Sequence, residues 1–286
     1  MGVKRGGWPL ALIGVTLLLA VAMLPAPARA TASAAVPLEL DPLVQAFVAE
    51  DVAVIEPHNQ THIVYRGLPL PAVLDRVLGT DWRTADAVEF VCADGYRASI
   101  EVAHLLAHRA WFAHARADGR AFELDNRLQG ETVALGPFYL VWDTLGDEAA
   151  RARGAAPWPY QVVAVAPVSL AAHFARAMPP AEAPADARRG FDIARRLCLH
   201  CHTMNGDGGG KAGELNTPAL ARRYANDAWL TAWLVAPASL KPGTTMPALE
   251  APTGERADTL AAVKAWLRAM TAAPAAARVF PVRMDD

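Results

Sequence analysis

Cysteine is scarce in this chain, whose 286 residues include only three. Cys198 and Cys201 are separated by two residues, whereas Cys92 is distant from both in sequence. A tetrahedral zinc site built on such a pair needs two further cysteine or histidine ligands at short spacing. The third cysteine is too distant to supply one, so the pair is short of ligands for zinc.

Several other signatures are missing as well. The sequence has no internal repeat, no heptad array and no cluster of basic residues, so we expect no nucleic-acid partner. It also has no nucleophile elbow, no phosphate-binding loop and no dinucleotide fingerprint. The sequence therefore offers no candidate catalytic residue, and we predict that the protein is not an enzyme.

The most informative segment that is present runs from Cys198 to His202 and reads C-x-x-C-H, the attachment motif of haem c. Its two thiols can add to the two haem vinyl groups, which brings His202 to the iron as the proximal ligand. A redox-active dithiol does not need the trailing histidine and would lie between a strand and a helix, whereas this motif follows the amphipathic run from Ala187 to Leu197. We therefore predict one covalent haem c on Cys198 and Cys201.

The second axial ligand is expected in the Pro- and Gly-rich segment from Lys241 to Pro247, which contains Met246. A thioether is a soft, neutral ligand that favours reduced iron. A methionine more commonly fills a core, but prolines on both sides of Met246 favour the ligand role. Met204 is too close to His202 to reach the other haem face, and Met270 falls in the expected last helix. The predicted cofactor-binding residues are Cys198, Cys201, His202 and Met246, of which His202 and Met246 bind the metal.

The haem motif is accompanied by further matches to one known family. They are Gly190-Phe191, Gly208–Lys211, Leu215–Leu220, Trp229, Trp233, Pro237 and the segment with Met246. Together they make residues 184–272 resemble a class I monohaem cytochrome c domain. The resemblance implies an all-α fold in which the carbonyl of Pro218 accepts the ring N–H of His202. It also implies that a last helix, over Glu255–Met270, packs across the first helix near Gly190.

The amino terminus has the pattern of a secretory signal peptide. Lys4 and Arg5 precede an apolar run from Leu10 to Leu24, and Ala28 and Ala30 supply the small residues of a cleavage site. We predict cleavage after Ala30, because a run of roughly 15 residues is short for a membrane span of about 20; an uncleaved anchor is the alternative. Export agrees with haem attachment outside the bacterial cytoplasmic membrane, as the resemblance implies. We therefore expect a periplasmic protein without membrane contact after cleavage.

Residues 31–177 are expected to form a mixed α and β region. Short runs rich in β-branched and aromatic residues predict strands at 52–55, 63–65, 88–92, 138–141 and 161–166. A helix is predicted over Leu70–Leu78, with Pro71 in its first turn and Gly79 just past its end. A second helical stretch is expected from Leu105 to Trp111.

Parts of this region match a second family. The matching segments are Tyr65–Leu74, Phe90–Tyr96, Gly136–Trp142 and Pro159–Val163. They resemble the molybdopterin-binding domain of the sulfite oxidase family, whose molybdenum-ligating cysteine precedes the first of these segments. This chain has no cysteine between Ala30 and Tyr65. We therefore predict a degenerate domain that binds no molybdopterin.

The other candidate ligands of this region are expected to be structural. Cys92 lies in a hydrophobic run before an Asp-Gly turn, where a small buried thiol packs well. His104 and His108, like His58 and His62, form a pair without a third ligand at suitable spacing. Surface or capping roles are favoured for these histidines.

A Pro- and Ala-rich stretch from Met178 to Ala185 is typical of a semi-rigid linker. The net charge changes across it, from −8 over residues 31–183 to +3 over residues 184–286. The predicted division is a signal peptide at 1–30, an α+β domain at 31–177, a linker at 178–186, a cytochrome c domain at 187–272 and a tail at 273–286.

The predicted fold class is thus a two-domain protein, with an amino-terminal sulfite-oxidase-like α+β domain and a carboxy-terminal all-α cytochrome c domain. Its expected function is to carry single electrons between redox partner proteins in the periplasm. One alternative is a molybdenum-dependent oxidoreductase with its own fused haem acceptor. Another is a haem-based sensor or assembly factor whose acidic domain binds a partner.

Overall fold

The computed structural model describes residues 1–2, 34–126, 130–147, 157–249, 251 and 254–272. The chain divides into two units, Met1–Thr31 and Ala32–Asp286, and the fold below is that of the second. Apart from Met1 and Gly2, the predicted signal peptide lies outside the described residues. Within the described ranges, no helix combines the length and the apolar character that crossing a membrane requires.

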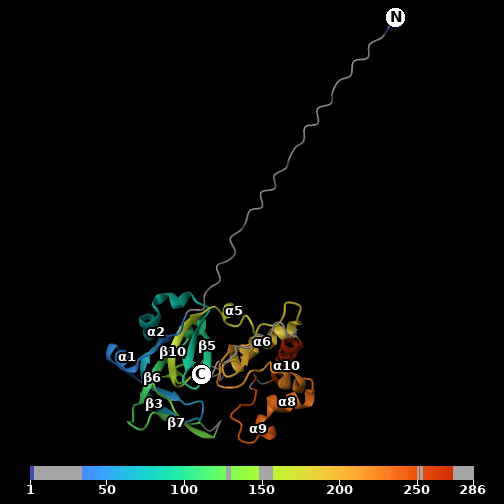
Figure 1. Ribbon diagram of the computed structural model, residues 1–286. Helices are drawn as coiled ribbons and strands as arrows, with labels where there is room; N and C mark the ends of the chain where they lie inside the picture. Colours follow the sequence, from blue (N-terminus) through green and yellow to red (C-terminus); the bar gives the residue numbers. More distant parts are fainter. Residues whose placement is uncertain (3–33, 127–129, 148–156, 250, 252–253, 273–286) are drawn as a thin grey trace, which may run out of the picture. The chain divides into compact units, whose positions relative to one another are not determined.

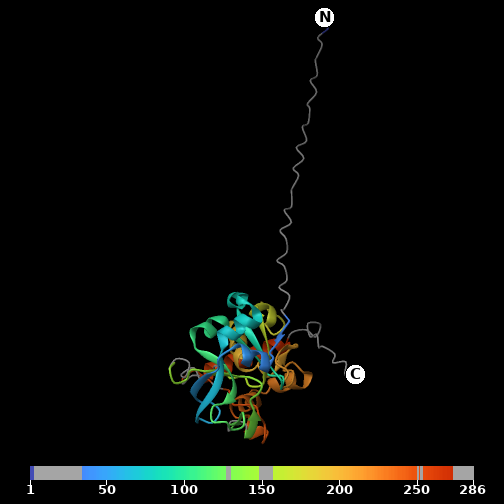
Figure 2. The same cartoon turned by 90° about the vertical axis from the view of Figure 1, so that its left-hand side faces the viewer.

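Two four-stranded antiparallel sheets organise the first half of this unit (Figures 1 and 2). The first sheet has the order β1 (Val36–Pro37), β10 (Val162–Val168), β4 (Ala87–Cys92) and β5 (Arg97–Glu101). The second has the order β2 (Glu50–Ile55), β3 (His62–Pro69), β6 (Ala110–Arg116) and β9 (Tyr139–Trp142). A separate hairpin consists of β7 (Glu123–Asn126) and β8 (Glu131–Ala134).

Both sheets contribute side chains to one hydrophobic core. Phe90 of β4 and Phe112 of β6 meet edge to face with their ring centroids 5.9 Å apart, and Phe138 lies 5.3 Å from Phe112. Helix α2 (Leu70–Leu78) adds Leu70 and Leu74, both fully buried. The shorter elements of this half are α1 (Leu40–Ala46), the 3-10 helix η1 (Thr80–Thr84) and α3 (Val102–Ala107).

Most of the local predictions for this half are confirmed. All five predicted strands are present, and α2 spans the predicted residues, with Pro71 in its first turn and Gly79 at φ 71° after its end. The predicted helix through Trp111 is wrong, because α3 ends at Ala107 and Trp111 belongs to β6. The first four residues of β6 are buried on both faces, so their unbroken apolar pattern does not distinguish a strand from a helix.

The second half contains most of the helices: α5 (Leu170–His173), α6 (Ala185–Leu197), α7 (Pro218–Tyr224), α8 (Asp227–Val235), α9 (Pro237–Leu240) and α10 (Arg256–Ala272). Helices α6 and α10 cross at Gly190, as expected. A Cβ atom at Gly190 would overlap the carbonyl oxygen of Ala262 and come within 2.9 Å of Cβ of Trp266. Only glycine permits so close an approach of the two helices.

The predicted fold class is wrong, because the carboxy-terminal region is not all-α. Strands β11 (Thr203–Met204) and β12 (Asp207–Gly208) form a small antiparallel hairpin directly after the haem motif, which gives the unit a mixed α/β architecture with several antiparallel sheets. Asn205 and Gly206 make its turn, both at positive φ, 54° and 84°. An Asn-Gly pair is the usual choice for such two-residue turns.

Candidate functional site

The C-x-x-C-H segment forms a tight turn at the end of α6. Cys198 is the residue that caps the helix, and its carbonyl accepts hydrogen bonds from the backbone N–H of Cys201 at 3.2 Å and of His202 at 2.9 Å. The helix therefore fixes the first thiol, and the turn fixes the histidine four residues later.

A cavity adjoins this turn, and its wall contains Cys198, His202 and Met246. Its empty volume, including the open space at its mouth, is about 790 Å³. The rest of the lining is mainly apolar and includes Leu215, Leu220, Tyr224, Trp229, Leu230, Trp233, Leu234, Val263, Trp266 and Leu267. Three of the four predicted site residues thus meet at one cavity, although Met246 is 44 residues from His202 in the sequence. Cys201, the fourth, does not line it.

His202 is held by a hydrogen bond that the sequence did not indicate. Its Nδ1 lies 2.8 Å from the carbonyl oxygen of Gly213, so Nδ1 carries the proton and donates, and Nε2 is left as the free ring nitrogen. Burial lowers the pKa of His202, which keeps the ring neutral, as a metal ligand must be. The expected acceptor, Pro218, is wrong: Pro218 is the first residue of α7, which Thr217 caps.

The unpredicted hairpin β11–β12 helps to place Gly213. Thr203 of β11 forms a parallel bridge with Glu214 and accepts a 2.8 Å hydrogen bond from the backbone N–H of Leu215. The carboxylate of Glu214 accepts from the backbone N–H of Asn205 at 2.9 Å and of Gly206 at 3.0 Å. These contacts fix the chain directly after Gly213, the hydrogen-bond partner of His202.

Met246 lies in an extended segment between α9 and α10. The hydroxyl of Thr244 accepts its backbone N–H at 3.2 Å, and the backbone N–H of Leu249 donates to the carbonyl of Leu234 at 2.7 Å, which fastens the segment to α8. Met204 and Met270 are instead buried in the helical core, 0% and 3% exposed, and neither lines the cavity.

Both thiols of the motif are protonated at neutral pH. Burial raises the pKa of Cys198 to about 12 and that of Cys201 to about 11. The pKa of Cys201 also responds to two nearby charges: Lys211 lowers it and Asp94 raises it. The environment of Cys201 therefore includes a residue from the turn between β4 and β5.

That turn touches the motif directly. The backbone N–H of Arg97 donates to the carbonyl of His200 at 2.8 Å, and the backbone N–H of Gly210 donates to the carbonyl of Gly95 at 2.8 Å. A Cβ atom at Gly209 would lie 3.1 Å from the backbone nitrogen of Arg97, so a side chain there would hinder the contact. No sequence pattern links these two segments, and the contact was not predicted.

The other candidate ligands lie in the β region, the part of the fold from β1 to β10. Cys92 is 3% exposed in the core between the sheets, and burial raises its pKa far above the usual value. The rings of His104 and His108 lie 4.4 Å apart, and Nδ1 of His108 bonds to Asp147. Among the described residues, no three His, Cys, Asp or Glu side chains gather as a metal site would require.

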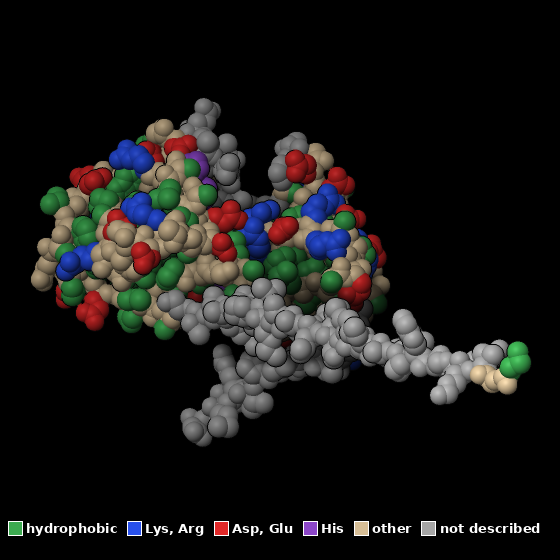
Figure 3. Space-filling view, turned by 90° about the horizontal axis from the view of Figure 1, so that it is seen from above, with side chains coloured by type: hydrophobic (Ala, Val, Ile, Leu, Met, Phe, Trp, Pro, Cys, Tyr) green, Lys and Arg blue, Asp and Glu red, His purple; other side chains and the backbone are tan. Residues whose placement is uncertain are grey.

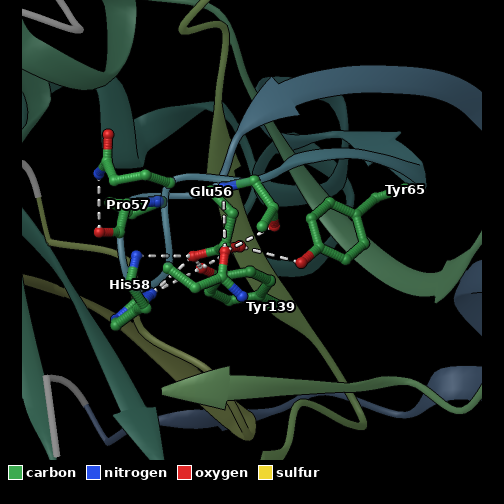
Figure 4. Close-up of polar contacts among 8 residues, drawn as sticks. Glu56, Pro57, His58, Tyr65 and Tyr139 are labelled. Carbon is green, nitrogen blue, oxygen red and sulfur yellow. Dashed lines mark hydrogen bonds and ion pairs between the residues drawn. The ribbon is translucent and has the colours of Figure 1, made fainter. Parts of the chain in front are cut away.

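Apart from the cavity, several polar side chains gather around one buried carboxylate, that of Glu56 (Figure 4). It is fully buried and accepts hydrogen bonds from the hydroxyls of Tyr65 and Tyr139, each at 2.9 Å, while Nδ1 of His58 lies 2.6 Å away. Burial and the carboxylate both raise the pKa of the two tyrosines. His58, for which a surface or capping role was expected, is thus part of this network, with its side chain 17% exposed.

No family model matches the chain, and a search of curated proteins finds no match.

Proposed function

We propose that the protein is a c-type cytochrome in the chemical sense, a carrier of single electrons with one covalently attached haem. The observation that carries the proposal is the shared cavity of Cys198, His202 and Met246. A bound haem would supply a one-electron couple between ferric and ferrous iron.

Each residue of the site has a part suited to that cofactor. Cys198 and Cys201 are free thiols that can form thioethers, and His202 offers a neutral Nε2 because its Nδ1 is engaged by Gly213. Met246 offers a neutral sulfur from a separate segment of the cavity lining. The apolar lining, with Trp229 and Trp233 stacked 5.7 Å apart, would exclude water from the ring.

If His202 and Met246 both bound the iron, no coordination position would remain for a substrate, and the haem would serve electron transfer rather than catalysis. A reduced partner protein would supply the electron and an oxidised partner protein would accept it, in the periplasm if the leader is cleaved as expected. On the face seen in Figure 3, acidic and basic side chains are interspersed rather than separated by sign. That face therefore does not favour a partner of one particular charge.

The test is to produce the chain with a haem-attachment system and to measure the mass of the denatured protein. One haem per chain is expected, and Cys198→Ala or Cys201→Ala should severely lower the yield of haem-bearing protein. Loss of all haem on denaturation of the wild type would refute the proposal. Elemental analysis should find iron and no molybdenum, and sulfite-dependent reduction of the haem would favour the molybdenum alternative.

A further inference from the structure

Lys211 connects the segment after the haem motif to the β region. Its ammonium nitrogen lies 2.7 Å from a carboxylate oxygen of Asp94 and 3.2 Å from the hydroxyl of Tyr160, and 5.3 Å from the centre of the Tyr160 ring. The side chains of Lys211 and Asp94 are only 25% and 23% exposed. This ion pair is therefore screened by solvent much less than a surface pair would be.

The backbone on both sides of Lys211 keeps the pair beside the haem motif. The N–H of Gly210 donates to the carbonyl of Gly95 at 2.8 Å, and the N–H of Ala212 donates to the carbonyl of Cys201 at 2.7 Å. A Cβ atom at Gly95, which has φ 87°, would lie 3.0 Å from the backbone nitrogen of Lys211. The turn and the segment are in contact along their main chains, so the backbones of Lys211 and Asp94 cannot separate without breaking these bonds.

The ammonium of Lys211 keeps its charge at neutral pH. Burial lowers the pKa of Lys211, but its contacts with Asp94 and Tyr160 raise it by more, so the ammonium is stabilised. Ala212, the residue after Lys211, donates its backbone N–H to the carbonyl of Cys201, so the pair lies beside the residue that would tether the haem. A haem bound through Cys201 would therefore lie within reach of the two charges.

We infer that Lys211 and Asp94 are a pair of opposed charges that sets the reduction potential of the haem, with the β region supplying the negative member. This inference rests on the proposed function. A nearby cation disfavours the ferric state, which has one more positive charge than the ferrous state, and so raises the potential; an anion lowers it. The β region thereby acts on the redox site without binding a cofactor of its own.

The experiment measures the midpoint potential of the haem-bearing full chain for matched variants. Lys211→Met should lower the potential, Asp94→Asn should raise it, and the double variant should return towards the wild type. Lys211→Arg keeps the charge and should keep the wild-type value. Arg83→Met removes the cation of another ion pair, the 2.9 Å contact of Arg83 with Asp75, and is the control that should leave the potential unchanged.

The possible results separate this inference from the proposal on which it rests. A wild-type protein without covalent haem overturns both. Haem attached normally, with a potential that neither Lys211→Met nor Asp94→Asn shifts, overturns only the inference. If both variants shift the midpoint potential in the same direction, the pair only positions the segment after the haem motif. That result also overturns the inference. If Lys211→Met fails to fold, Asp94→Asn and Lys211→Arg still decide the question.

Discussion

The hydroxyl of Tyr96 lies 3.1 Å from Nδ1 of His200, across 104 residues of sequence. His200 is buried and Tyr96 is partly buried, and the contact joins the turn between β4 and β5 to the middle of the haem motif. Burial lowers the pKa of His200 to about 4, so the ring is neutral at pH 7. The β region therefore forms part of the surroundings of the candidate site.

Tyr96→Phe should destabilise the folded protein by roughly 1 to 2 kcal/mol, because it leaves a buried ring nitrogen without its partner. His200 has no compensating bond, since its Nε2 has no hydrogen-bond partner among the described residues. Urea unfolding measures the difference. An unchanged free energy of unfolding would mean that water replaces the hydroxyl.

Gly190→Ala should destabilise the protein by at least 2 kcal/mol or so, because the new methyl group overlaps the carbonyl of Ala262 where α6 and α10 cross. Gly210→Ala is the matched control, since a Cβ atom at Gly210 meets nothing within 4 Å. Thermal unfolding compares the two variants. Equal melting temperatures would show that α6 and α10 can move apart to accommodate the methyl group without loss of stability.

Glu89 should make stability depend on acidic pH. Burial raises the pKa of its carboxyl, but His173, 3.2 Å away, and Arg97, also at 3.2 Å, lower it by more, so it lies below the usual value. The stabilisation is present above the unfolded-state pKa of about 4.3 and is lost as the pH falls through the folded-state pKa. Glu89→Gln should therefore be less stable than the wild type at pH 7, with the gap narrowing below pH 4.3. A gap that stays constant with pH would contradict this assignment.

Met246→Ala should abolish the sulfur-to-iron charge-transfer band of the ferric protein, lower the potential and let carbon monoxide bind readily. Met270→Ala is the control, because Met270 is buried in the helical core. Absorption spectra and titration with carbon monoxide measure both effects. If Met270→Ala loses the band and Met246→Ala keeps it, the ligand assignment is wrong.

The leader prediction is tested by sequencing the amino terminus of the exported protein. Cleavage after Ala30 gives a chain that starts at Thr31. Recovery of the intact chain from membranes, with Leu10–Leu24 retained, would establish an anchor instead.

Local patterns predicted much of the secondary structure, because the β-branched residues of β2 and the Pro71 and Gly79 signals of α2 depend only on neighbouring residues. The Asn205-Gly206 pair is a hairpin signal that can be read from the sequence, whereas the all-α region was predicted from the family resemblance alone, which did not include this hairpin. The partner of His202 was beyond prediction, since any carbonyl can accept and only the fold decides that Gly213 does. The proposed two-domain division stays a prediction.

The two main-chain hydrogen bonds from Arg97 to His200 and from Gly210 to Gly95 bear on how this protein can be dissected. A fragment that starts at the Pro- and Ala-rich stretch keeps α6, the cavity and Met246. It lacks Arg97, the donor of the first bond, and Gly95, the acceptor of the second. The carbonyl of His200 and the N–H of Gly210 would then face solvent, and Lys211 would lose its carboxylate. Such a fragment should be less stable than the intact chain and should bind haem at an altered potential, so it is a poor substitute for the whole protein in redox measurements.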